Sequence, residues 1–237
     1  MNAPLKLRHR IVPAVAGVAV VALLAAAGWH GYQAVISQPL KRVIFAGDLD
    51  RLPHADLDAL AAAVQAAERP SLASVREAAR RVPWVREATV RRRFPDGVEI
   101  TFEAHEALAR WDERSLVSRR GEIFAAESAA ALPRMRGPEG AAPAMAGEYP
   151  AIVTALAPIG SPVAELRLSA RGAWEVLLEN GLAIELGRGD WSLRARRFAA
   201  AWPRLAEEAR ATRYADLRYP NGFALRGTAE ITTPRKK

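Results

Sequence analysis

Hydrophobic residues run from Ile11 to Trp29 without a charge, and the charged residues of the preceding tail, 1–10, are all basic. As a helix this run would be about 28 Å long, close to the ~30 Å hydrocarbon core of a bilayer. Because the positive charges precede it, we expect the tail in the cytoplasm, a transmembrane anchor over 11–32 and the rest outside. A cleaved secretory signal is the alternative, since the alanines at 25–27 resemble a cleavage site. Either way, the larger part of the chain leaves the cytoplasm.

Residues 40–104 carry the hydrophobic spacing of a small α+β unit. An extended run, 40–47, precedes two segments between residues 57 and 82 in which apolar residues recur three and four positions apart, as on one helix face. Two extended segments follow, 84–94 and 98–103, and in the second apolar and polar residues alternate as in a strand with one buried face. The pattern predicts the order strand, helix, helix, strand, strand.

From residue 105 to 226 the pattern predicts a mainly antiparallel β-sheet domain with flanking helices. The alternating run from Trp174 to Leu186 is interrupted by Asn180-Gly181, a strong hairpin signal. The stretch 132–147 is rich in Pro, Gly and Ala and predicts a loop. The predicted class of the whole chain is therefore α+β.

The end of this domain consists of two extended runs, Ala215–Tyr219 and Phe223–Leu225, around a Pro220-Asn221-Gly222 bend. A polar tail over 227–237 follows, which we expect to be disordered. Since no later strand follows to pair with these runs, they are expected to present a free sheet edge to which a partner strand can add.

Composition agrees with an exported domain that needs no disulfides, because the chain has no cysteine. The 34 basic residues exceed the 26 acidic ones, which favours anionic lipid headgroups, cell-wall polymers or acidic protein segments as partners over nucleic acid. The densest basic cluster, Arg91–Arg93, is either a solvated strand face or a binding patch.

The sequence predicts no enzyme, and we expect no catalytic, cofactor, metal or small-molecule site. Its histidines have no metal-ligand spacing, and no G-x-S-x-G or S-x-x-K motif is present. Gly187 and Gly189 supply only a fragment of a phosphate-binding loop, so a turn is expected there. Glu175, Glu179 and Glu185 are interpreted as solvated carboxylates on exposed faces of the hairpin.

Three phrases resemble one family, the FtsQ/DivIB proteins of bacterial cell division. Trp84–Asp96 (WVREATVRRRFPD) is similar to that family's W-V-x-x-A-x-V-x-R-x-W-P-D, Glu106–Trp111 to its E-x-P-[IV]-A-x-W, and Asp216–Ala224 to its D-L-R-Y-x-N-G-[FY]-A. The resemblance implies a POTRA domain over 40–104 and a β domain over 105–226. It also implies a single-pass inner-membrane protein, with its bulk periplasmic, at the division septum.

By the same resemblance, the chain is a scaffold of the divisome that links early and late division proteins to control septal peptidoglycan synthesis. The POTRA domain takes part in recruitment, and the β domain binds the small bitopic proteins FtsB and FtsL. Ser169–Trp174 (SARGAW) is similar to a further landmark of the family. The residues that the motifs place at this contact are Arg171 of that phrase and Arg218, Tyr219, Asn221 and Phe223 of the last one.

Two alternatives remain open. A POTRA-bearing module of a secretion or outer-membrane assembly complex would also bind polypeptide by strand addition, although repeated POTRA units are not seen. A secreted wall hydrolase, released by signal cleavage, would need a catalytic constellation that the sequence does not reveal.

Overall fold

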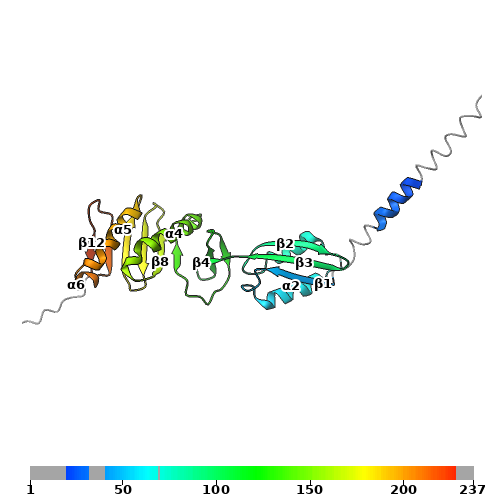
Figure 1. The fold of residues 1–237 in the computed structure, drawn as a ribbon, viewed down its shortest axis with the longest axis horizontal. Coiled ribbons are helices and arrows are strands. Elements are labelled where there is room, and N and C mark those ends of the chain that lie inside the picture. The colour runs from blue at the N-terminus through cyan, green and yellow to red at the C-terminus, as the bar shows by residue number, and fades with distance from the viewer. Residues whose placement is uncertain (1–19, 32–40, 69, 228–237) are drawn as a thin grey trace, which may run out of the picture. The chain divides into compact units, whose positions relative to one another are not determined.

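The computed structural model describes residues 20–31, 41–68 and 70–227. They belong to two compact units, Met1–Ala104 and His105–Lys237, whose arrangement relative to each other is not determined (Figure 1).

The expected anchor lies only partly within the described residues. Residues 20–31 form a helix, whereas 11–19 and 32 lie outside the description, as do the tails 1–10 and 228–237. Among the residues described, no helix is both long and apolar enough to span a membrane. The anchor therefore stays a prediction.

The first unit has the element order that its hydrophobic pattern predicts. Its elements are β1 (Arg42–Gly47), α2 (His54–Ala66), α3 (Leu72–Ala79), β2 (Val85–Arg93) and β3 (Gly97–Ala104). The sheet order is β1-β3-β2, with β1 parallel and β2 antiparallel to the central β3.

One face of this three-stranded sheet carries the core of the unit. Val98, Ile100 and Phe102 of β3 are buried together with Leu60 of α2 and Val75 of α3. Because side chains alternate along a strand, the polar residues between them point to the opposite face. The helices thus cover one face and leave the other open.

The second unit contains a nine-stranded mixed sheet in the order β12-β11-β10-β9-β8-β7-β4-β5-β6. Its strands are β4 (Ala107–Arg110), β5 (Ser115–Ser118), β6 (Ile123–Ala125), β7 (Arg134–Arg136), β8 (Val163–Leu168), β9 (Trp174–Leu178), β10 (Ala183–Gly187), β11 (Tyr214–Asp216) and β12 (Ala224–Arg226). Most pairs are antiparallel, as predicted, but β7 is parallel to both of its neighbours and β11 is parallel to β10.

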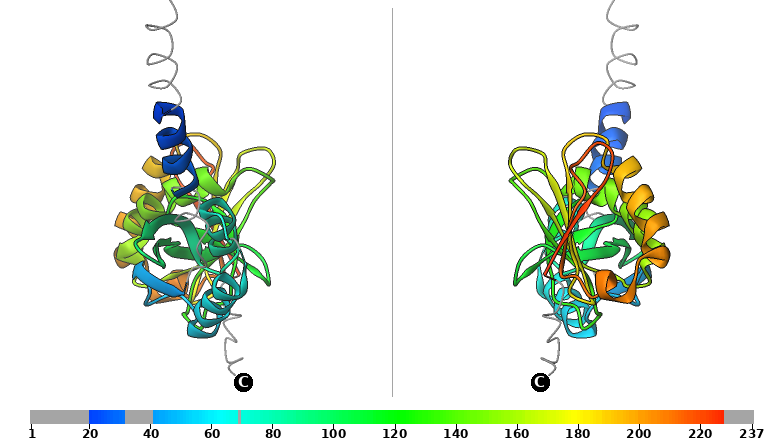
Figure 2. Two further views of the ribbon diagram at one scale, coloured as in Figure 1. Left: turned by 90° about the vertical axis from the view of Figure 1, so that its right-hand side faces the viewer. Right: turned by 90° about the vertical axis from the view of Figure 1, so that its left-hand side faces the viewer.

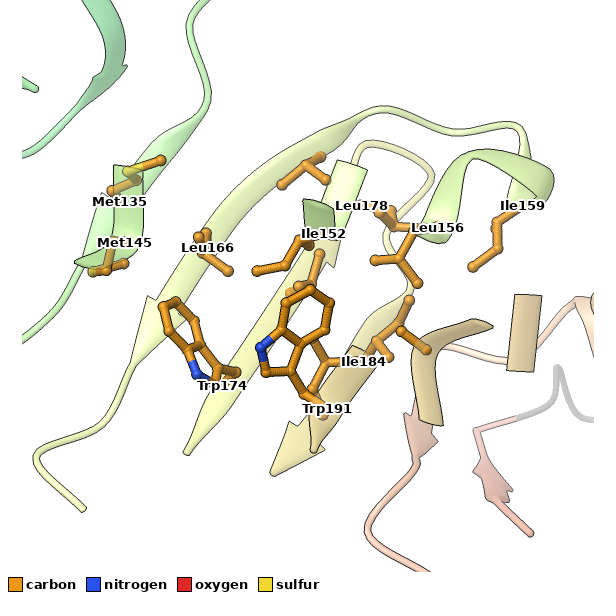
Figure 3. Close-up of a cluster of buried hydrophobic side chains, with 14 of the residues drawn as sticks. Met135, Met145, Ile152, Leu156, Ile159, Leu166, Trp174, Leu178, Ile184 and Trp191 are labelled. Atoms are coloured by element: carbon orange, nitrogen blue, oxygen red, sulfur yellow. The ribbon is translucent and has the colours of Figure 1, made fainter. Parts of the chain in front are cut away.

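The helices of this unit lie on one side of the sheet in both views of Figure 2. They are α4 (Ala142–Leu156), α5 (Trp191–Ala201) and the short α6 (Glu207–Arg210), with 3₁₀ turns at Ala157–Ile159 (η1) and Trp202–Arg204 (η2). Ile152 and Leu156 of α4 lie over Leu166, Leu178 and Ile184 of three neighbouring strands (Figure 3).

The loop predicted over 132–147 is wrong, because this stretch contains β7 and the beginning of α4. Pro occupies the first turn of α4, where its missing N–H costs no hydrogen bond. Met135 and Met145 are fully buried, so the segment is ordered by tertiary burial that its Pro- and Ala-rich composition does not reveal.

Candidate functional site

Strand β12 forms one edge of the nine-stranded sheet as described, and β11 pairs with it from the inner side. An edge strand presents N–H and C=O groups that can pair with another chain. The strand predicted over Ala215–Tyr219 is shorter in the structure, since β11 ends at Asp216 and residues 217–223 form a loop. The available edge is therefore β12, and β11 lies inside the sheet.

Arg218 is fixed at the start of this loop by a two-pronged hydrogen bond to Asp216. Its Nε donates to Oδ1 at 2.9 Å and its Nη2 to Oδ2 at 2.7 Å, while the backbone N–H of Arg218 also donates to Oδ1 at 3.0 Å. The Asp216 side chain is 4% exposed and that of Arg218 is 58% exposed. The hydrogen bonds between the two side chains lower the pKa of Asp216 and raise the pKa of Arg218.

Asp216 belongs to a row of carboxylates on the sheet face opposite the helices. Glu175 of β9 lies beside Glu185 of β10, which lies beside Asp216 of β11. Burial raises the pKa of Glu185; the charge of Arg218 opposes this shift, and Glu175 and Asp216 reinforce it. Glu175 and Glu185 are half-buried, and Arg167 lies 3.6 Å from Glu175. Of the three carboxylates interpreted as solvated, Glu179 is exposed, whereas Glu175 and Glu185 are only partly exposed to water.

The loop 217–223 is held from the helical side by Arg197 of α5. The guanidinium donates to the carbonyl oxygens of Pro220 at 2.6 Å, Tyr219 at 3.1 Å and Gly222 at 3.5 Å. A planar guanidinium can satisfy several acceptors at once. Arg197, which is partly buried, thus fixes the backbone of the bend through its carbonyl oxygens.

The candidate residues of the loop differ in exposure. Tyr219 is 49% exposed and Asn221 is exposed as well. Phe223 is partly buried, and its ring contacts Phe198 edge-on at a centroid distance of 4.9 Å. Tyr219 and Asn221 are accessible to a partner, whereas Phe223 also serves the core.

Arg171 lies in the turn between β8 and β9, which Gly172 closes with a φ of +77°. The pairing of β9 with β10 places this turn beside Gly187, and the parallel β11 ends at the same side. The turn that contains Arg171 and the loop 217–223 therefore share one end of the sheet. All five residues singled out in the sequence lie at this end or along its edge.

Two groups of this site were missed in the sequence. Arg197 gave no signal, because its role depends on a loop some 20 residues further along the chain. Asp216 and Arg218 are two positions apart, and in the strand predicted there this spacing puts two side chains on the same face. Their ion pair could therefore have been predicted from the sequence. The described residues contain no cluster of three or more metal-ligating side chains, and the arrangement offers main-chain pairing and side-chain contacts.

Comparison with known proteins agrees with this architecture. The family model described as "Cell division protein FtsQ/DivIB, C-terminal" matches residues 109–218, and "POTRA domain, FtsQ-type" matches residues 39–103. The chain belongs to the FtsQ/DivIB family. The family resemblance seen in the three phrases is confirmed, and cell division is the process in which the chain takes part.

The relatives cover most of the chain. The cell division protein FtsQ of Xanthomonas campestris is 35% identical over 230 residues, which are 95% of this chain and 81% of that protein. FtsQ of Neisseria gonorrhoeae is 35% identical over 86% of both chains. FtsQ of Burkholderia pseudomallei is 43% identical over 64% of both. The similarity therefore extends over both units rather than over one shared module.

Proposed function

We propose that this FtsQ/DivIB protein is a non-enzymatic, single-pass inner-membrane scaffold of the divisome that binds FtsB- and FtsL-type partners through the edge of its β domain. The observation that supports it most is the exposed edge strand β12 beside the ordered loop that carries Arg218, Tyr219 and Asn221. A partner strand that pairs with β12 gains main-chain hydrogen bonds, and side chains at the sheet end supply specificity.

The charges at this end favour a partner segment that carries carboxylates. Arg218 uses Nε and Nη2 for Asp216, so its Nη1 can donate to a carboxylate of the partner. Arg171, exposed in the neighbouring turn, can do the same. Tyr and Arg are the residue types enriched where truncation weakens an interface most.

Strand addition is tested with the full-length chain in detergent and a synthetic FtsB-like segment. N-methylation removes the N–H groups on one side of the added strand, so one alternate set of methylated amides should abolish binding and the other set should not. Equal binding by both methylated segments would contradict pairing along β12.

The side-chain contribution is tested with Tyr219→Ala. It should weaken partner binding about thirtyfold if Tyr219 contributes ~2 kcal/mol, with little change in melting temperature because the ring is half exposed. Leu193→Ala on α5, where the side chain is 57% exposed, is the matched control and should bind normally. A large drop in melting temperature that accompanies the loss of binding would indicate that Tyr219 stabilises the fold rather than contacts the partner.

Arg218 is tested with Gln rather than Glu, because a carboxylate at this position would face Asp216 and Glu185. Arg218→Gln should weaken binding because it removes the charge. Asp216→Asn keeps the charge of Arg218 but removes the carboxylate that orients its side chain, so it should weaken binding less. The same binding for wild type and both variants would remove Arg218 from the contact.

The location is tested in cells. A fluorescent fusion should gather at mid-cell, depletion should give filaments, and alkaline phosphatase fused after Gly227 should be active. A soluble mature product beginning near Gly28 would instead indicate signal cleavage.

A further inference from the structure

The first unit has a basic tip, which takes no part in the partner contact proposed for the second unit. The turn between β2 and β3 and the beginning of β1 meet there, because the backbone N–H of Lys41 donates to the carbonyl oxygen of Asp96 at 2.8 Å. Arg42 of β1 and Arg93 of β2 both lie opposite Gly97 of β3. Lys41, Arg42, Arg93 and Phe94 therefore meet at one end of the unit, which we call the basic tip; its three cations exceed the single carboxylate of the turn, Asp96.

Phe94 is the second feature of this tip. Its side chain is 70% exposed, more than any other large hydrophobic side chain in the two described segments 41–68 and 70–227. Transfer of a phenyl ring from water into an apolar environment is favourable. An exposed aromatic ring flanked by cations is the combination found in segments that rest on membrane surfaces.

The opposite end of the same strands carries no comparable excess of cations. Asp48 follows β1, and Glu87 lies beside Glu103 at the far ends of β2 and β3, where Glu87 pairs with Arg80 at 2.6 Å and Glu103 with Arg86 at 3.5 Å. The strands are 6–9 residues long, or roughly 20–30 Å at 3.3 Å per residue. This exceeds the ~8–10 Å screening length at physiological salt, so an anionic surface that attracts the tip is screened from the charges of the other end.

The geometry of β2 shows how the three arginines of the cluster Arg91–Arg93 are distributed between the two faces of the strand. Arg91 and Arg93 are exposed, whereas Arg92 is half-buried on the other side of the strand, as strand alternation requires. Arg93 forms an ion pair with Glu99. The cluster is therefore not one continuous patch, and only Arg93 of the three belongs to the basic tip.

The chain itself brings the basic tip to a bilayer. Lys41 follows Gly31, the last residue of the described N-terminal helix, by only ten positions, which span at most ~36 Å even when fully extended. The tip is thus the end of the first unit at which the chain arrives from the proposed anchor. Such a tether raises the effective concentration of the membrane surface around the tip.

We propose that the basic tip of the first unit docks on the anionic lipid headgroups of the membrane in which the chain is anchored, with Phe94 inserted among them. This inference rests on the anchor in the proposed function. Docking holds the first unit in one orientation, with its strands directed away from the bilayer.

The absence of cysteine from the chain allows a test on the full-length protein in lipid nanodiscs. A spin label is attached to a single cysteine, either at the tip (Asp96→Cys) or, as the matched control, at the far end (Asp50→Cys). Accessibility to oxygen reports contact with lipid, and accessibility to a water-soluble nickel chelate reports exposure to water. Discs with and without phosphatidylglycerol are compared.

In anionic discs the label at 96 should be shielded from nickel and accessible to oxygen, and the label at 50 should remain exposed to water. Each cation near an anionic surface contributes about fivefold, so Lys41→Glu with Arg42→Glu should lower the ratio of docked to undocked chains by at least about 25-fold. Phe94→Ser should reduce the oxygen accessibility, and high salt should release the tip. Circular dichroism checks that each variant is folded.

Equal water exposure of both labels in anionic discs, in a chain that co-elutes with the discs, overturns the docking while leaving the anchor intact. Shielding of the label at 96 only after another division protein is added also overturns it, in favour of a protein partner. A chain that does not co-elute with the discs overturns the proposed anchor and the docking with it.

Discussion

Arg197 is predicted to order the loop that carries the candidate partner residues. Its guanidinium donates to Pro220 at 2.6 Å and Tyr219 at 3.1 Å, with Gly222 at the 3.5 Å limit. A hydrogen bond from a charged donor contributes about 1.5–3 kcal/mol when it is well protected. The loop is at the surface, where water can replace the donor, so about 0.5–1 kcal/mol for each of the two short bonds is the appropriate scale.

Arg197→Met removes both bonds and keeps most of the side-chain volume. The free energy of opening the loop should fall by about 1–2 kcal/mol, which corresponds to about five- to thirtyfold more of the open form. Hydrogen exchange measured for the peptide spanning 217–223 should accelerate by this factor. Binding of an FtsB-like segment should weaken by up to the same factor, because only the ordered fraction is competent to bind.

Two further variants test the role of Arg197 in ordering the loop. Arg197→Lys keeps the charge but lacks the planar fork, so its effect should be intermediate. Arg196→Met is the control on the same helix, since Arg196 is exposed and donates to Ser192 at 3.2 Å rather than to the loop. Unchanged exchange in Arg197→Met, or an equal change in Arg196→Met, would refute the role given to Arg197.

Three other predictions concern stability. Burial raises the pKa of Glu185 in the folded chain. As the pH rises above about 4.3, this carboxyl group therefore loses its proton first in the unfolded state, and the stability of the fold decreases. Glu185→Gln should raise the melting temperature at pH 7, and this effect should disappear near pH 4. Gly187→Ala should cost about 1–2 kcal/mol, because φ is +72° and the added Cβ would lie 2.7 Å from Cγ of Arg218, and a melting temperature equal to wild type would contradict this. Ile100→Ala should cost about 2–5 kcal/mol and Phe198→Ala about 3–5 kcal/mol, and calorimetry should show each change in the transition of its own unit, since each residue is fully buried in a separate core.

Local patterns in the sequence were sufficient for the elements whose partners lie nearby along the chain. The first unit follows its spacing from β1 to β3, because each helix and strand there shows one clear apolar face. The β9–β10 hairpin follows from Asn180-Gly181, where Gly181 has a φ of +85° and Asn180 Oδ1 accepts from the N–H of Leu182 at 3.1 Å. These interactions depend on two to four neighbouring residues, so the sequence alone determines them.

The tertiary structure decided the features that depend on distant partners. Strand β7 and the beginning of α4 become ordered only because Met135 and Met145 find a common core. The exposed edge became β12, since β11 ends early and inserts beside β10. Arg197 acquired its role from a loop that it meets only in the folded chain. Pro- and Ala-rich stretches, short edge strands and single surface arginines have no periodic signature, so burial and long-range hydrogen bonds determine their structure.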